Sequence, residues 1–400
     1  MKDYSGNNII NLTLAGHGAT GKTLLAESLL LNSKKIRKSG SIEDGSTVSD
    51  YHDYEIEAQH SMTLSVLAFE YAEKKINMID TPGYLDFHGE IKCALRVSDC
   101  VLNVVSASDG VLVGNDLVAD YAKKEFNAPM MIDINMCDRE QSDFDSVLTS
   151  LKESIGRIAF PLTFPLNEGE GFSKVVDVLN KKIHSYKTDE SGAYNSSDLD
   201  SDLVAKVDAL HEELIELIAE SDEKLLEKYF EDGELSYEDA QNGIKNAILT
   251  GSLVPVFCTS GAKNIGVLSM LEMISSFSPT SADTKDPDAS ELSAFVFKTI
   301  SQEHVGEISF FRVFSGEITA GQDVKNTLKN DTEKLRQLFC ASGNERVEVP
   351  RISCGDIGAV LKLKNTHTGD TLCLPKDSTK LKGINFPTDN MSYAIELSSS

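Results

Sequence analysis

Short apolar runs alternate with amphipathic stretches along the first part of the chain. The runs cover residues 9–15, 76–80, 101–105 and 130–134 and are typical of strands buried on both faces. Residues 22–31 carry leucines at helical spacing. Strand, crossover and strand repeated in this order predict an α/β domain, with a mainly parallel sheet and helices on both faces. Ligands of such sheets bind at the carboxyl ends of the strands.

The alternation is interrupted over about residues 160–252. This stretch starts with a strand-like run at 160–166, continues through a polar loop at 188–201, and holds a long acidic amphipathic helix at 202–219. A strand at 254–258 then returns to the sheet. The pattern therefore predicts a subdomain inserted into the α/β domain.

A second change of pattern follows residues 278–288, which are polar, contain proline and predict a linker. Short strand candidates punctuated by glycines then predict an all-β barrel. We expect the α/β domain to span 1–280 and the barrel domain 281–400. The strand candidates are 292–300, 307–313, 324–328, 346–349 and 357–363, and the glycines are Gly316, Gly321, Gly343, Gly355 and Gly369.

The segment after the first strand matches the phosphate-loop pattern G-x-x-x-x-G-K-T. Glycines let backbone N–H groups close around phosphate oxygens, and the N-terminus of the following helix favours an anion. We expect Lys22 to reach the β- and γ-phosphates and Thr23 to bind Mg²⁺. A chance Gly-rich turn is the alternative, and the order of strand, loop and helix argues against it. The nucleotide-binding residues expected here are Gly16, His17, Gly18, Ala19, Thr20, Gly21, Lys22, Thr23 and Leu24.

The tetrapeptide Asp80-Thr81-Pro82-Gly83 ends the strand 76–80. An acid at this place suits the magnesium side of the phosphates. The backbone N–H of Gly83 is placed to sense whether the γ-phosphate is present. Taken alone, the tetrapeptide could be an ordinary Pro-Gly turn. The phosphate loop upstream favours the nucleotide interpretation.

Base identity is expected from Asn135-Met136-Cys137-Asp138, which follows the strand 130–134. Guanine-specific GTPases carry N-K-x-D here, and the Asp accepts two hydrogen bonds that adenine cannot supply. Leaving such a buried charge unpaired rejects the wrong base by as much as about 10⁴–10⁵-fold. Asn135 and Asp138 are present, and the aliphatic stem of Met136 can still cover the ring. We therefore expect GTP or GDP with Mg²⁺, and a last guanine-contacting loop at Ser260, Gly261 and Ala262.

Charge and cysteine content narrow the possible partners. The net charge of −25 argues against broad, sequence-independent nucleic-acid binding, although local contacts with a large ribonucleoprotein stay open. Seven scattered cysteines without a C-x-x-C pair predict free thiols in a reducing cytosol. No apolar run approaches the roughly 20 residues of a membrane span, and no signal peptide is apparent. We expect a cytoplasmic monomer without membrane contact.

Together these segments resemble a translational GTPase, most closely elongation factor G. The inserted subdomain favours elongation factor G over the aminoacyl-tRNA-delivering relatives, which lack it. The resemblance covers both domains and is most specific in the second. Residues 80–87 look like D-T-P-G-H-V-D-F, residues 256–267 are similar to V-F-C-G-S…K-N-K-G-V, residues 229–234 fall where the family has K-Y-L-E-G-E, and residues 305–306, 312–316, 321, 355–360 and 368–372 look like the family's second domain.

The resemblance implies several further roles. Thr63, in Ser61-Met62-Thr63, stands for the switch threonine that contacts Mg²⁺ only in the triphosphate state; a strand-edge threonine is the alternative. The implied partner is the ribosome, through its stalk proteins and ribosomal RNA. The acidic helix at 202–219 either meets the stalk or is simply a solvated acidic face.

Three positions depart from the family pattern. Tyr84 stands where the family histidine positions the attacking water. Tyrosine, with an ordinary pKa near about 10, can hydrogen-bond a water but is a poor base at neutral pH. Losing such a group costs about 10²–10⁴-fold in rate. Met136 replaces lysine and Ala19 replaces the usual Asp, whereas His17 matches a family histidine and is expected to be structural. This pattern indicates a divergent, second-copy elongation factor G-like subgroup.

The leading hypothesis is a GTP-binding factor that acts on the ribosome in a translocation-type role and hydrolyses GTP as the full-length protein. Its expected catalytic residues are Lys22, Gly83 and Tyr84, and its metal-binding residues are Thr23, Thr63 and Asp80. The alternative is a ribosome-binding factor that uses GTP as a conformational ligand with little or no hydrolysis. A metabolic or assembly ATPase is a third possibility, against which Asp138 and the barrel argue. Residues 394–397 look like the start of the family's third domain, so we expect a two-domain piece of a longer protein.

Overall fold

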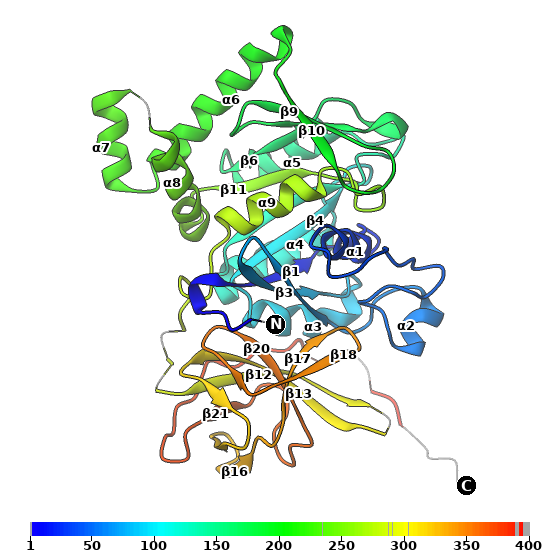
Figure 1. The fold of residues 1–400 in the computed structure, drawn as a ribbon, viewed down its shortest axis with the longest axis vertical. Helices are drawn as coiled ribbons and strands as arrows, with labels where there is room; N and C mark the ends of the chain where they lie inside the picture. The colour runs from blue at the N-terminus through cyan, green and yellow to red at the C-terminus, as the bar shows by residue number, and fades with distance from the viewer. Residues whose placement is uncertain are drawn as a thin grey trace.

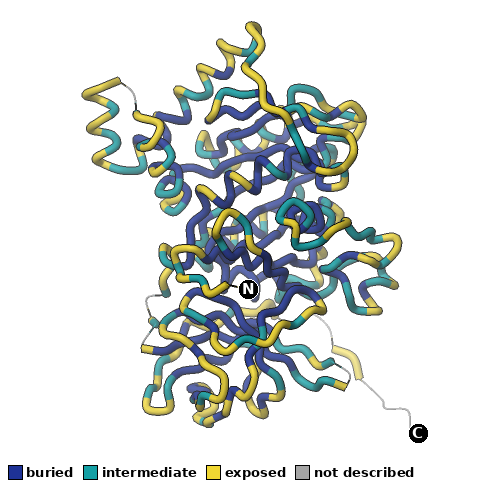
Figure 2. Tube along the Cα trace, in the orientation of Figure 1, coloured by how far each residue is buried: buried dark blue, intermediate teal, exposed yellow. Residues whose placement is uncertain are grey.

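The computed structural model describes residues 2–233, 235–286, 288–289, 291–302, 304–388 and 392–394. Figure 1 shows three parts along the long axis: the inserted subdomain, the α/β domain and a β-rich domain. Figure 2 shows that burial runs continuously through the sheets of the α/β and β-rich domains, whereas exposed residues gather on the helices of the inserted subdomain and on the loops. Residues 395–397 of the expected start of a third domain lie outside the described residues. Glu234, in the 229–234 motif, also lies outside them.

The central sheet confirms the predicted α/β fold. The six neighbouring strands β3, β1, β4, β5, β11 and β6 are parallel, and β2 pairs antiparallel with β3. The apolar runs of the sequence supply the inner strands because both faces of these strands are covered. The order across the sheet is β2 (Ser65–Tyr71), β3 (Lys74–Asp80), β1 (Ile9–Ala15), β4 (Cys100–Ser106), β5 (Met130–Asn135), β11 (Val254–Cys258) and β6 (Ala159–Pro161).

The alternation of side chains along β1 explains how helices cover both faces of this sheet. Ile10, Leu12 and Leu14 belong to one buried cluster with residues of α1 (Lys22–Asn32) and α9 (Val267–Phe277). Ala15 belongs to a second cluster with α3 (His88–Arg96) and α4 (Val113–Asp120). A helix of π type, η3 (Tyr121–Phe126), continues α4, and α5 (Phe144–Ile155) packs beside β5 and β6.

The inserted subdomain is an antiparallel sheet of β7 (Thr163–Pro165), β8 (Lys174–Asp177), β9 (Lys182–Tyr186) and β10 (Tyr194–Asp198), followed by α6 (Ser201–Ala219), α7 (Glu223–Asp232) and α8 (Tyr237–Thr250). The predicted strand at 160–166 is two strands, because the chain leaves the central sheet after β6 and enters the second sheet at β7. The predicted polar loop at 188–201 contains β10, a largely exposed edge strand whose partner among the described strands is β9.

The β-rich domain carries β12 (Ser293–Gln302), β13 (Gly306–Ser315), β15 (Asp323–Asn326), β16 (Asp331–Lys334), β17 (Leu338–Ser342), β18 (Glu345–Val349), β20 (Ile357–Leu361) and β21 (Thr371–Cys373). The short strands β14 (Ile318–Thr319) and β19 (Arg351–Ile352) form a separate ladder. Among the described strands the main pairing is an open path, so a closed barrel stays a prediction. A contact between Ser342 of β17 and Leu67 of β2 makes the two domains share one sheet.

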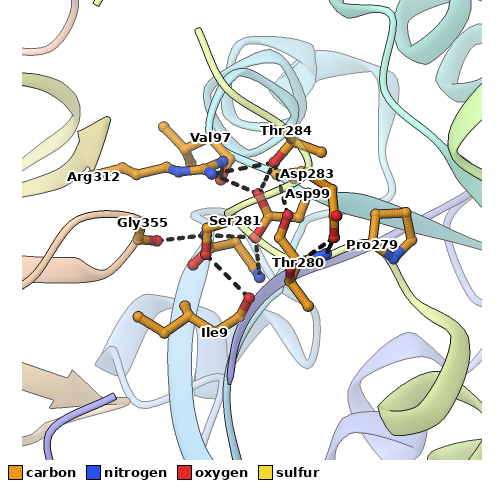
Figure 3. A network of polar contacts seen from close by, with 12 residues as sticks. Ile9, Val97, Asp99, Pro279, Thr280, Ser281, Asp283, Thr284, Arg312 and Gly355 are labelled. Atoms are coloured by element: carbon orange, nitrogen blue, oxygen red, sulfur yellow. Dashed lines mark hydrogen bonds and ion pairs between the residues drawn. The ribbon is translucent and has the colours of Figure 1, made fainter. Parts of the chain in front are cut away.

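A buried polar network joins the β-rich domain to the α/β domain (Figure 3). Arg312 of β13 donates from Nη2 to Oδ1 of Asp99 at 2.5 Å and from Nη1 to the carbonyl oxygen of Val97 at 3.0 Å. Asn11 of β1 donates from its side chain to Asp99 at 2.9 Å and to the carbonyl oxygen of Gly355 at 2.8 Å. Both partners of the ion pair are buried, so this contact is part of the core rather than a surface bridge.

Residues 278–286, in the segment expected to be a linker, pack into this interface. Ser278 and Thr280 are buried, and the backbone N–H of Ser281 donates to the carbonyl oxygen of Ile9 at 3.0 Å. Thr284 contacts Asp99 directly (Figure 3). Ser281 and Thr284 are therefore polar because they make hydrogen bonds within the fold, which polarity alone cannot distinguish from solvation.

Candidate functional site

The phosphate loop lies at the carboxyl end of β1 and turns into α1. Gly16 has φ +146°, and a Cβ there would lie 2.3 Å from the carbonyl oxygen of Val104, so only glycine fits. Gly21, with φ +84°, caps the N-terminus of α1, and Lys22 is the first residue of that helix. The loop between them thus approaches the helix N-terminus, where backbone N–H groups are available to an anion.

Lys22 is a buried cation held by backbone carbonyl groups. Its Nζ donates to the carbonyl oxygens of Gly16 at 3.1 Å and His17 at 2.6 Å. Burial lowers the pKa of Lys22 to about 8, against the opposing charges of Asp80 and Asp50. A phosphate oxygen beside Nζ would raise this pKa again, because an opposite charge at short range favours the charged form.

Asp80 and Thr23 form the expected metal side of the pocket. Oδ2 of Asp80 accepts from Oγ1 of Thr23 at 3.1 Å and from Oγ of Ser49 at 2.5 Å. Oδ1 is buried and has no partner among the described residues. Burial raises the pKa of Asp80. A hydroxyl and an orphaned carboxylate oxygen are the hard donors that Mg²⁺ takes beside water and phosphate, so these residues fit that ion.

The loop at Gly83 lies directly against the phosphate loop. A Cβ at Gly83 would lie 2.4 Å from Nζ of Lys22 and 2.7 Å from the backbone nitrogen of Gly18. The ring of Tyr84 covers Gly18, with Cε1 3.1 Å from the position of a Cβ there, and is 43% exposed. The residue expected to sense the γ-phosphate and the residue replacing the family histidine therefore both border the phosphate loop.

Asn135 connects the expected base-binding loops to the phosphate loop. Its Nδ2 donates to the carbonyl oxygen of Thr20 at 2.9 Å, and its Oδ1 accepts from the backbone N–H of Gly261 at 2.8 Å. Gly261 in turn accepts from Oγ of Ser28 on α1 at 2.6 Å. The loop after β11 is thereby held against the start of α1.

The other base-binding candidates differ in their surroundings. Met136 has φ +65° and borders the same cavity as the phosphate loop. The carboxylate of Asp138 lies 3.5 Å from Nζ of Lys263, while Ser260 is buried and Ala262 is exposed. His17 has a buried Nδ1 without a partner among the described residues, its ring lies against Gly114, and it is not one of the residues that line the cavity.

Part of this set lines a cavity of about 280 Å³ at the carboxyl ends of the strands, whereas Asp80, Asn135, Asp138 and residues 260–262 are not among its lining residues. The sequence placed the phosphate-loop, Gly83, Tyr84 and Met136 positions there. It did not place residues 42–61, the closing segment, which supply Ile42, Asp50, Gln59, His60 and Ser61 to the other side of the cavity. The lining residues are Gly18, Ala19, Gly21, Lys22, Thr23, Leu24, Ile42, Asp50, Gln59, His60, Ser61, Gly83, Tyr84, Met136 and Arg139.

Thr63 lies apart from this cavity. Its backbone N–H and hydroxyl donate to Oε1 of Glu55 at 3.0 and 3.3 Å, and Glu55 is fully buried. Ser61, two residues earlier, borders the cavity instead, with Oγ 3.3 Å from Oγ1 of Thr23. The Ser-x-Thr spacing offers two hydroxyls, and only the folded chain shows which one reaches Thr23.

Asp50 is a further residue that sequence reasoning missed. It borders the cavity, and burial together with the charge of Asp80 raises its pKa to about 7, although a hydrogen bond from Ser61 opposes this. No motif marks Asp50, because it lies in an irregular segment whose position depends on the whole fold.

Comparison with known proteins agrees with this geometry. The family model for the elongation factor Tu GTP binding domain matches residues 7–195, and the model for elongation factor G domain 2 matches residues 291–374. The chain belongs to the elongation factor G-like translational GTPases. The chain is also similar to a crystal structure of a protein from Thermus thermophilus, with a TM-score of 0.84 and 28% identity over 92% of this chain and 54% of that chain.

The elongation factor G-like chain thus spans about half the length of that Thermus thermophilus protein. The comparisons confirm the resemblance and the fold class drawn from the sequence. In the part of the chain that the structure describes, every helix is too short or too polar to cross a membrane.

Proposed function

We propose that this chain binds GTP with Mg²⁺ and hydrolyses the γ-phosphate, as part of a translation factor that acts on the ribosome. One observation carries the proposal: Lys22, Thr23 and Gly83 border one cavity, and Thr23 donates a hydrogen bond to Asp80 at 3.1 Å. These residues come from the start of α1, the end of β3 and the loop that follows β3, which meet at one edge of the sheet.

The chain's own residues would divide the work as follows. Lys22 and the amides of the phosphate loop stabilise the charge on the transferring phosphate. Thr23 and Asp80 would hold Mg²⁺, with Ser61 beside Thr23 or Thr63 in the triphosphate state as a further ligand, and the ion would supply positive charge near the β- and γ-phosphates. Asp138 and Asn135 select guanine. Gly83 reports the γ-phosphate through its backbone N–H.

The proposed cellular role is a translocation-type action on the ribosome in the cytoplasm. Family membership supports it, as does the β-rich domain held against the nucleotide-binding domain by buried contacts. The net charge of −25 favours contact with ribosomal proteins, or with RNA through local patches, over a broad RNA-binding face. Contact of the acidic α6 with the ribosomal stalk belongs to the same proposal.

A second candidate function is GTP binding without significant hydrolysis. Tyr84 supports it, because the phenol stands beside Gly18 and Gly83 where the family places an imidazole. In that case GTP acts as a conformational ligand, and replacing Tyr84 with His should create turnover.

The two candidates separate in one set of measurements. Affinity for GDP, a non-hydrolysable GTP analogue and ADP is measured first, with Mg²⁺ and with chelator. GTP turnover is then measured with and without ribosomes. Guanine-specific, Mg²⁺-dependent binding with ribosome-stimulated turnover is the expected result. Binding without turnover favours the second candidate, and preference for ADP would contradict both.

A further inference from the structure

His60 is a cavity-lining side chain to which neither the motifs nor the family pattern gives a role. It lies on the segment before Ser61 and borders the cavity together with Lys22 and Gly83. Its ring centroid is 4.8 Å from that of Tyr84, and the two rings meet edge to face at 65°. An imidazole therefore stands next to the tyrosine that has taken the place of the family histidine.

The hydrogen bonding of His60 fixes which nitrogen can accept. Nδ1 lies 3.2 Å from the backbone carbonyl oxygen of Ser61. A carbonyl oxygen can only accept, so in the neutral ring Nδ1 carries the proton and Nε2 keeps its lone pair. Nε2 has no hydrogen-bond partner within the described ranges. The ring is thus oriented by its own backbone and leaves one acceptor available.

Tyr84 and His60 together offer what a water-positioning site requires. The phenol of Tyr84 can hydrogen-bond a water but is a weak base, whereas a neutral imidazole accepts a hydrogen bond well. We propose that His60 is the residue that positions the attacking water, with Tyr84 packed beside it, in the GTP hydrolysis proposed above, on which this inference rests. The imidazole function would come from the segment that closes the cavity rather than from position 84.

The step balances with water and GTP alone. The water oxygen forms a bond to the γ-phosphorus while the bond from that phosphorus to the β–γ bridging oxygen breaks. The electron pair of the broken bond stays on GDP. Nε2 accepts a hydrogen bond from the water and orients its lone pair toward phosphorus, and the water proton ends on the released phosphate.

Two substitutions separate positioning from packing. His60→Phe keeps an aromatic ring against Tyr84 but removes the acceptor. His60→Gln removes the ring but returns an acceptor oxygen. A structural role predicts that the Phe variant works better, and a positioning role predicts that the Gln variant does. His88→Ala is the matched control, because His88 contacts Tyr121 through its ring and borders a different part of the surface.

The test is single-turnover GTP hydrolysis by the whole chain with ribosomes, alongside affinity for GDP and a non-hydrolysable GTP analogue. We expect the rate of His60→Phe to fall by about 10²-fold, at the low end for loss of such a group, while nucleotide affinity changes by less than about twofold. We expect His60→Gln to recover part of the rate and His88→Ala to match the unaltered chain.

Each other outcome has a distinct meaning. If His60→Phe hydrolyses GTP as fast as the unaltered chain, the inference is wrong and the proposed GTPase stands. If His60→Phe loses affinity for both nucleotides, His60 serves binding and the inference is also wrong. If the unaltered chain binds GTP but turns none over, both the hydrolysis and the role of His60 fail, and the conformational-ligand function remains.

Discussion

Asp133 is an acid inside an apolar strand. It lies fully buried on β5, and the hydroxyl of Thr259 lies 2.9 and 2.8 Å from its two carboxylate oxygens as a hydrogen-bond donor. Burial raises its pKa to about 7, and the Thr259 hydrogen bonds only partly oppose this. The folded protein therefore keeps this carboxyl protonated over a pH range in which the unfolded chain ionises it, since the ordinary pKa is about 4.

We expect Asp133→Asn to flatten the pH dependence of stability. Between about pH 4 and 7 the folded state binds the Asp133 proton and the unfolded state does not, so this group's contribution to stability falls as pH rises. From about pH 5 to about pH 8 the unaltered chain should lose about 2–3 kcal/mol of unfolding free energy that the variant keeps. Urea unfolding of both proteins at the two pH values measures the difference. Parallel losses in the two proteins would contradict the raised pKa.

The elements that the sequence predicts well are those whose signal is local. The strands β1, β5 and β11 are apparent as apolar runs because neighbours cover both of their faces. The β2–β3 hairpin lacks a clear local signal, because its turn uses Ala72 and Glu73 at φ +46° and +58°. Asn-Gly or Gly-Gly at those positions would have been the usual signal.

The candidate site also has one part with a local sequence signal and one part without. The phosphate loop is one continuous segment, residues 16–23, so a single motif identifies it. The closing segment carries no such motif, and whether Ser61 or Thr63 faces Thr23 depends on how Glu55 holds the chain. Tertiary contacts decide this orientation, and the role of Thr63 as the switch threonine of the triphosphate state, which the family resemblance implies, stays a prediction.

This orientation predicts that Ser61→Ala and Thr63→Ala will differ. Ser61→Ala should weaken Mg²⁺-dependent binding of a non-hydrolysable GTP analogue by about 10-fold relative to GDP, because the hydroxyl beside Thr23 is lost from the metal side of the cavity. Thr63→Ala should leave that ratio nearly unchanged, because its hydroxyl binds Glu55. Titrations of both nucleotides at fixed Mg²⁺ measure the ratio. The opposite ranking would show that the segment rearranges to present Thr63, as the family resemblance implies.

At the scale of the whole molecule, β1 and β3 connect the domain interface to the nucleotide site. Asn11 and Asn77 lie near the interface ends of these strands, and Asn77 donates to Oδ1 of Asp356 in the β-rich domain at 2.9 Å. The same two strands lead to Gly16 and Asp80 at their other ends. These two strands therefore contact both the interface with the second domain and the nucleotide site.

The ion pair between Arg312 and Asp99 provides the last prediction, since it is buried between the two domains. Removing one partner leaves the other charge buried and uncompensated, so Arg312→Met or Asp99→Asn alone should each cost about 3–5 kcal/mol of unfolding free energy. Methionine is chosen because Arg312 also packs over the ring of Phe314, a contact that an unbranched apolar side chain can partly keep. The double variant removes both charges and should recover much of the loss, because neither charge is then left unpaired. Urea unfolding followed by probes in each domain measures the costs. Single losses that simply add in the double variant would mean that the two charges stabilise the interface independently.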